Sequence, residues 1–172
     1  VVEYIPGEVM LYYYLGVAEF VNKHYEDAIS SLSSGVENKR ADTPKSLMGE
    51  LFVMLGDYYH KLGKMEEAYA AYDSCLVYTP DMVMCLNNYA YFLSLEKRDL
   101  KRAEEMSYKA ITAEPNNAIY LDTYAWILYQ EGNYADAKTY IDMAIKNLDP
   151  PEENEDNKEI FDHLRAINEK IK

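Results

Sequence analysis

Residues 120–145 read YLDTYAWILYQEGNYADAKTYIDMAI, and this stretch sets bulky aromatic side chains beside small ones. The small positions are Ala125, Ala137 and Ala144, and tyrosines and Trp126 surround them. A single helix has no need for small residues at set intervals. Two helices that cross closely do need them, because small side chains let helix axes approach to about 8–10 Å. The stretch therefore predicts a tightly packed helical hairpin that stacks on similar hairpins.

The same skeleton recurs at three other places in the chain. Three series of small residues mark the predicted helix crossings: Gly16, Gly56, Ala90 and Ala125; Ala28, Ala68, Ala103 and Ala137; Gly35, Cys75, Ala110 and Ala144. Gly63 and Gly132 are placed to end first helices, and Pro80 and Pro115 to end second helices. Extra residues before the second hairpin, TPKSLM, predict an early helix start with Thr43 as cap and Pro44 as the first helical residue.

With an aromatic residue, Leu-Gly, Tyr, Ala, a second aromatic and Pro at fixed places, the chain resembles the tetratricopeptide repeat (TPR) family. The resemblance implies an all-α fold, a right-handed α-solenoid of antiparallel helix pairs. It predicts one solenoid domain over residues 1–172 with four repeats and a C-terminal capping helix. The predicted parts are a tail of an upstream repeat at 1–6, repeats at about 9–42, 49–82, 83–117 and 118–151, and the capping helix at 156–172.

The two ends of the chain carry separate predictions. Pro6 stands where Pro ends a second helix, so VVEYIP is interpreted as the tail of an upstream repeat that would cover the first helix. Near the other end, Ile160, Phe161, Leu164, Ile167 and Ile171 share one helical face. Arg165 takes the small-residue position, which favours a capping helix over the alternative of a degenerate fifth repeat.

Composition and charge exclude several classes of function. The 172 residues carry a formal net charge of −13, which disfavours nucleic acid and anionic membrane as main partners. No apolar run reaches the roughly 18 residues of a membrane helix. The three histidines are scattered, and no metal-ligand spacing or glycine-rich phosphate loop occurs. We therefore predict a protein that is no enzyme and has no cofactor or metal, with Cys75 and Cys85 as buried thiols; a disulfide between them is the alternative.

The resemblance to the family implies a binding surface on the concave side, lined by the first helices. Carried onto this sequence, its residues include Phe20, Val53 and Ser94. The predicted partner-binding groove itself consists of Tyr13, Val17, Asp57, His60, Asn87, Tyr91, Asp122, Trp126 and Tyr129. Tyr91 and Trp126, with Asn87 and Asp122 beside them, predict an aromatic floor flanked by amide and carboxylate groups. The alternative is that these aromatic rings only pack between neighbouring first helices.

These features predict a scaffold that binds a protein or peptide segment in the concave groove. Acidic residues on the same side, among them Glu50 and Asp57, favour a neutral or basic partner. The family's clamp for acidic chaperone tails is not expected, since the positions where it carries Lys, Arg and Asn are Tyr13, Val17, Met54 and Asp57 here. The alternative function is a structural spacer or a self-association segment of a larger repeat protein, without a ligand of its own, and self-association would use the N-terminal end. The sequence of the third and fourth repeats is similar to bacterial TPR proteins, some of them tied to the cell envelope. This resemblance favours a periplasmic or envelope-associated location, with the cytoplasm as the alternative.

Overall fold

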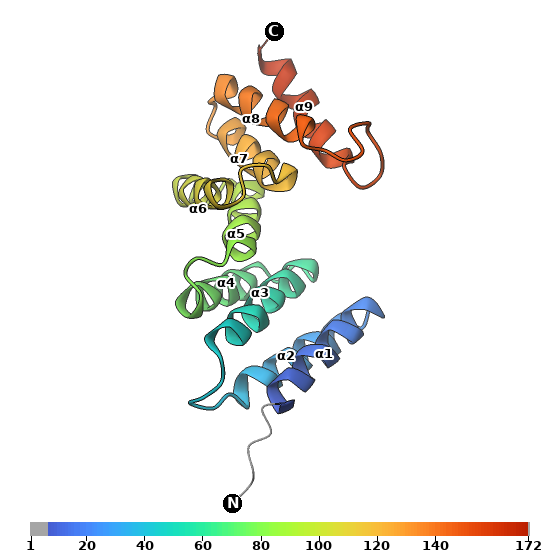
Figure 1. The fold of residues 1–172 in the computed structure, drawn as a ribbon, viewed down its shortest axis with the longest axis vertical. Coiled ribbons are helices and arrows are strands. Elements are labelled where there is room, and N and C mark those ends of the chain that lie inside the picture. Colours follow the sequence, from blue (N-terminus) through green and yellow to red (C-terminus); the bar gives the residue numbers. More distant parts are fainter. Residues whose placement is uncertain (1–6, 172) are drawn as a thin grey trace, which may run out of the picture. The chain divides into compact units, whose positions relative to one another are not determined.

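The computed structural model describes residues 7–171, and every regular element among them is an α-helix (Figure 1). The tail predicted for residues 1–6 lies outside the described residues. In chain order the helices are α1 (Gly7–Val21), α2 (Tyr25–Glu37), α3 (Lys45–Lys61), α4 (Met65–Tyr78), α5 (Val83–Leu95), α6 (Leu100–Ala113), α7 (Ala118–Gln130), α8 (Tyr134–Lys146) and α9 (Lys158–Ile171). None of the described helices is both long and apolar enough to cross a membrane.

The chain divides into two compact units, an N-terminal unit up to Cys85 and a C-terminal unit from Leu86 onward. In the N-terminal unit α1 packs on α2, and α3 packs on both α2 and α4. In the C-terminal unit α7 packs on α6 and α8, and α9 packs on α8 and α7. A single continuous domain over residues 1–172 stays a prediction.

The small residues lie at the helix crossings, as the sequence predicts. All eight glycines and alanines of the first two series are buried, and six of them, the alanines, have no exposed surface at all. The third series, Gly35, Cys75, Ala110 and Ala144, is buried as well. Helix pairs therefore meet where side chains are smallest, and the hydrophobic core forms around these points.

Glycine is required at two of these crossings because a bulky side chain stands opposite. A Cβ added at Gly56 would lie 2.4 Å from Cε1 of Tyr72, and one added at Gly16 would lie 2.7 Å from Cδ2 of Leu32. Contacts this short force the opposite side chain to move. Glycine at these two positions therefore makes room for Tyr72 and Leu32, both of which are completely buried.

The ends of the helices agree with the sequence in most places. Gly63 and Gly132 adopt φ values of +71° and +85°, so α3 and α7 are each followed by the left-handed conformation that glycine favours. The early start of α3 is confirmed, but the cap was predicted one residue too early. Pro44 is the N-cap, with ψ of 134°, and the Thr43 hydroxyl instead accepts the backbone N–H of Arg40 at 2.9 Å.

Helix α9 is amphipathic, with one correction to its predicted apolar face. Ile160 and Ile167 are buried, whereas Ile171 is 49% exposed. His163 is buried on that face instead, because it lies three residues after Ile160 and four before Ile167. A buried histidine needs a polar partner, and that partner comes from α7.

Candidate partner-binding surface

We call the predicted groove residues of the first helices the first-helix surface, and each unit contributes its own part. The N-terminal unit holds Tyr13, Val17, Asp57 and His60. The C-terminal unit holds Asn87, Tyr91, Asp122, Trp126 and Tyr129.

In the N-terminal unit all four residues are half-buried. The carboxylate of Asp57 accepts a hydrogen bond of 2.5 Å from the hydroxyl of Tyr72, whose side chain is completely buried. Burial raises the pKa of Tyr58 to about 12, with smaller contributions from Asp57 and Tyr13. The Asp57 carboxylate therefore stabilises its own helix pair as well as adding negative charge to the surface.

Aromatic rings border this part of the surface. Phe20 stacks on Tyr58 with ring centroids 3.9 Å apart and planes 8° from parallel. The Tyr13 ring meets Tyr14 edge-on at 5.4 Å. Burial, and then the charge of Glu50, raises the pKa of Tyr13. This part of the surface thus combines rigid half-buried rings with carboxylates, a combination common at interfaces.

In the C-terminal unit three of the predicted residues, Tyr91, Asp122 and Trp126, contact α9. The Asp122 carboxylate pairs with Nδ1 of His163 at 2.9 and 3.0 Å. Trp126 lies between two rings, stacked on His163 at 4.0 Å and on Tyr129 at 4.7 Å. The Tyr91 hydroxyl donates to the carboxylate of Glu159. Glu159 and His163 are one helical turn apart, so one face of α9 contacts this part of the surface.

Burial governs the charges in this cluster. Desolvation raises the pKa of Asp122, although the hydrogen bond and the charge of His163 act in the opposite direction. Burial also raises the pKa of Tyr91, and the hydrogen bond to Glu159 adds to the effect. Asn87 is only 3% exposed. Its Oδ1 and Nε1 of Trp126 are buried without a hydrogen-bond partner within residues 7–171, which costs about 1–3 kcal/mol for each such group.

The sequence predicted Tyr91, Asp122 and Trp126 as members of this cluster but did not predict His163. Tyr91, Asp122 and Trp126 of the predicted patch each contact α9 of the same chain, through Glu159 or His163. These are packing contacts with α9 and not between neighbouring first helices, and binding of a partner by Asn87, Tyr91, Asp122, Trp126 and Tyr129 stays a prediction. The signal for His163 was its position on the apolar face between Ile160 and Ile167.

The two cysteines are buried free thiols. The Cys75 sulfur lies 3.6 Å from the hydroxyl of Thr79, and the Cys85 thiol donates to the backbone carbonyl of Tyr72 at 3.7 Å. Both therefore fill small-residue positions in the N-terminal unit, as predicted. Within the described part of the chain, no group of three or more His, Cys, Asp or Glu side chains could hold a metal ion.

Comparison with known proteins shows which proteins the chain resembles in sequence and fold. The profile described as "Tetratricopeptide repeat" matches residues 49–81. A curated "TPR repeat-containing protein" of Pseudomonas aeruginosa is 34% identical over 67 residues, which is 39% of this chain and 11% of that protein. The match thus spans only a small part of the length of this relative.

Solved structures resemble the chain over most of its length. MamA of Desulfovibrio magneticus has a TM-score of 0.72 at 17% identity, and the match covers 94% of each chain. YrrB, described as a TPR protein with an unusual peptide-binding site, has a TM-score of 0.67 at 19% identity over 81% of this chain and 68% of its own. At these identities the likeness shows the fold alone, and it confirms the predicted all-α solenoid of helix pairs.

Proposed function

We propose that this chain, as a member of the tetratricopeptide repeat family, binds a partner protein at the first-helix surface of its N-terminal unit. The fold of this family generally serves as a scaffold for protein–protein interaction and not for catalysis. The residues proposed to contact the partner are Tyr13, Val17, Asp57 and His60. The observation that carries the proposal is the binding of α9 in the C-terminal unit. There, Asp122 and Trp126 of the equivalent surface contact one face of an amphipathic helix.

The partner segment is proposed to be neutral or basic. Asp57 and Glu50 place negative charge beside Tyr13 and Tyr58, and the whole chain has a formal net charge of −13. Opposite charge steers association and suppresses acidic partners. Binding should therefore weaken as salt is raised, because exposed charges are screened within about 10 Å at 0.1 M ionic strength.

Site-specific crosslinking can identify the partner and test the surface together. A photoreactive phenylalanine at position 13 should capture the partner, whereas the same group at Tyr108, which is 54% exposed in the C-terminal unit, should not. With the captured partner in hand, Tyr13→Ala should weaken binding about tenfold by calorimetry, as expected for a rigid aromatic anchor. Equal capture at both positions, together with an unchanged dissociation constant, would discard this surface.

A second candidate function is self-association, and the outer face of α1 favours it. Leu11, Tyr14 and Val21 are 69%, 64% and 73% exposed, and Met10 and Leu15 are exposed beside them. A cluster of exposed apolar side chains of this kind marks an interaction site. Light scattering over a concentration series should then show a dimer that Leu11→Lys abolishes. A monomer at every concentration rules out this alternative without affecting the proposal above.

A further inference from the structure

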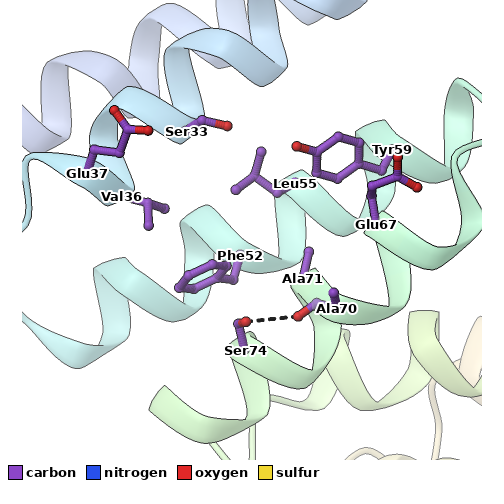
Figure 2. A pocket seen from close by; sticks show the side chains of 10 residues that line it. All are labelled: Ser33, Val36, Glu37, Phe52, Leu55, Tyr59, Glu67, Ala70, Ala71 and Ser74. Carbon is purple, nitrogen blue, oxygen red and sulfur yellow. Dashed lines mark hydrogen bonds between the residues drawn. The ribbon is translucent and has the colours of Figure 1, made fainter.

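A groove in the N-terminal unit is bordered by α2, α3 and α4 (Figure 2). Its volume is about 340 Å³, near the lower end of the roughly 300–1,000 Å³ typical of ligand sites. Each helix contributes residues at helical spacing, for example Ser33 and Val36 from α2 and Phe52 and Leu55 from α3. We call this opening the second-helix groove, since α2 and α4 form its two sides and α3 its floor.

The floor of the second-helix groove is apolar and fixed. Leu55 and Ala71 are each only 5% exposed, so the core of the helix pair holds them in place. The Phe52 ring stacks on Tyr78 at 5.6 Å, which orients it at the edge of the floor. Ala70 and Ala71 are small, and they leave the space that a longer side chain on α4 would fill.

The rim of the groove carries two acidic groups. Glu37 on α2 and Glu67 on α4 stand at opposite sides of the opening (Figure 2). Both are exposed, and neither carboxylate has a hydrogen bond or ion pair with any described residue. The Tyr59 hydroxyl points into the opening between them. Apolar floor and acidic rim together match a ligand that is apolar in its middle and basic at its ends.

The groove lies on a different side of α3 from the first-helix surface. Phe52, Leu55 and Tyr59 follow one helical stripe, whereas Asp57 and His60 follow another, since successive residues turn by about 100°. A segment in the groove would therefore leave the first-helix surface accessible.

We propose that the second-helix groove is a separate docking site for a basic peptide segment of a partner protein. One leucine-like or aromatic side chain of the segment lies on Leu55, Phe52 and Val36, and a Lys or Arg on each side of it pairs with Glu37 and Glu67. A second copy of this chain is disfavoured as the occupant, because its net charge of −13 opposes two carboxylates at the rim.

Selection from a random dodecapeptide phage library tests this site before any natural partner is identified. Phage are selected on the wild-type chain alone, and binding of the enriched peptides is then compared with binding to Ala70→Trp, a substitution at an exposed position that fills the groove. Enriched peptides are then synthesised, and their dissociation constants are measured by fluorescence anisotropy. Circular dichroism verifies that each variant remains helical.

Two matched control variants distinguish a specific effect of the groove on peptide binding from general effects of charge and bulk. The double variant Glu37→Lys, Glu67→Lys reverses the charge of the rim. The control Glu26→Lys, Glu155→Lys makes the same change in net charge at exposed positions that do not line the groove. Ala113→Trp, at an exposed position of α6, is the control for Ala70→Trp.

The proposal expects enriched peptides with an apolar residue between basic ones. Their dissociation constants should rise about tenfold or more with the reversed rim and with Ala70→Trp, and stay within about twofold in both controls. Absence of enrichment, acidic peptides, or equal weakening in the control variants would overturn it. If Tyr13→Ala abolishes binding and Ala70→Trp does not, the peptides occupy the first-helix surface; the groove proposal then fails while the proposed function stands.

Discussion

The position directly after the central small residue of the first helix behaves differently in the two units. In the N-terminal unit it is Asp57, whose carboxylate accepts the hydroxyl of Tyr72 from the second helix of the same hairpin. In the C-terminal unit it is Trp126, whose ring stacks on His163 of α9. Equivalent positions of two repeats thus differ in their contacts: Asp57 stabilises its own hairpin, whereas Trp126 contacts the neighbouring helix α9.

Removal of His163 should break the contact with α9 most strongly. In His163→Ala the Asp122 carboxylate is left buried without its partner, and Trp126 loses a stacked ring. We expect the free energy of unfolding of the C-terminal unit to fall by about 3 kcal/mol, measured by urea denaturation. Trp126 is the only tryptophan, so its fluorescence should shift as well. His24→Ala, at an exposed histidine, is the control; equal losses in the two variants would contradict the stabilising role of the pair.

Gly56→Ala should produce the next largest effect, now in the N-terminal unit. The added Cβ would lie 2.4 Å from Tyr72, so that ring must move and its hydrogen bond to Asp57 weakens. We expect a loss of about 2 kcal/mol in the free energy of unfolding. Gly16→Ala should cost less, because the added Cβ would lie 2.7 Å from Cδ2 and Cγ of Leu32, a wider separation than the 2.4 Å at Gly56. Similar losses for both glycines in thermal and urea denaturation would show that ring packing is not the cause.

Helix capping offers a smaller contrast between the units. The Asn117 side chain accepts the backbone N–H groups of Ile119 and Tyr120 at the start of α7. At the start of α3, Pro44 offers no side-chain cap. Asn117→Ala should therefore lower the free energy of unfolding by about 1 kcal/mol, whereas Pro44→Ala should change it less. A larger loss for Pro44→Ala, measured under the same conditions, would argue against capping as the source of the difference.

The smallest expected effect is on the pH dependence of stability. Burial raises the pKa of Tyr58, in the N-terminal unit, and of Tyr124, in the C-terminal unit, to about 12. The unfolded chain ionises these phenols near pH 10. Between about pH 10 and 12 the folded state therefore holds more protons, and stability falls as pH rises. Tyr58→Phe and Tyr124→Phe should each reduce this fall, as measured by denaturation at pH 9, 10 and 11; an unchanged slope in both variants would refute the assignment.

The fold could be predicted from the sequence because its signals are local and repeated. Glycine or alanine at residues 16, 28, 56, 68, 90, 103, 125 and 137 predicts close helix crossings, and all eight are buried. Four copies in register leave few alternative arrangements, since each small residue must meet a neighbour at a similar place. The errors, at Thr43 and Ile171, concern helix ends, where a shift of one residue or one turn costs little.

The candidate site was predicted only in part because its contacts join distant segments. Asp122 and His163 are 41 residues apart, and no repeat spacing links them. The second-helix groove was not foreseen either, since Glu37, Leu55 and Glu67 come from three helices and border one opening only when α2 and α4 flank α3.

The sequence by itself determined the helices, their crossings and the family of the fold, because helical periodicity and side-chain size act between near neighbours in the chain. Only the tertiary structure decided that α9 covers Asp122 and Trp126 and that a groove opens between α2 and α4. Burial of a charged pair and the shape of an opening depend on how separate helices meet, and that is a property of the packed molecule.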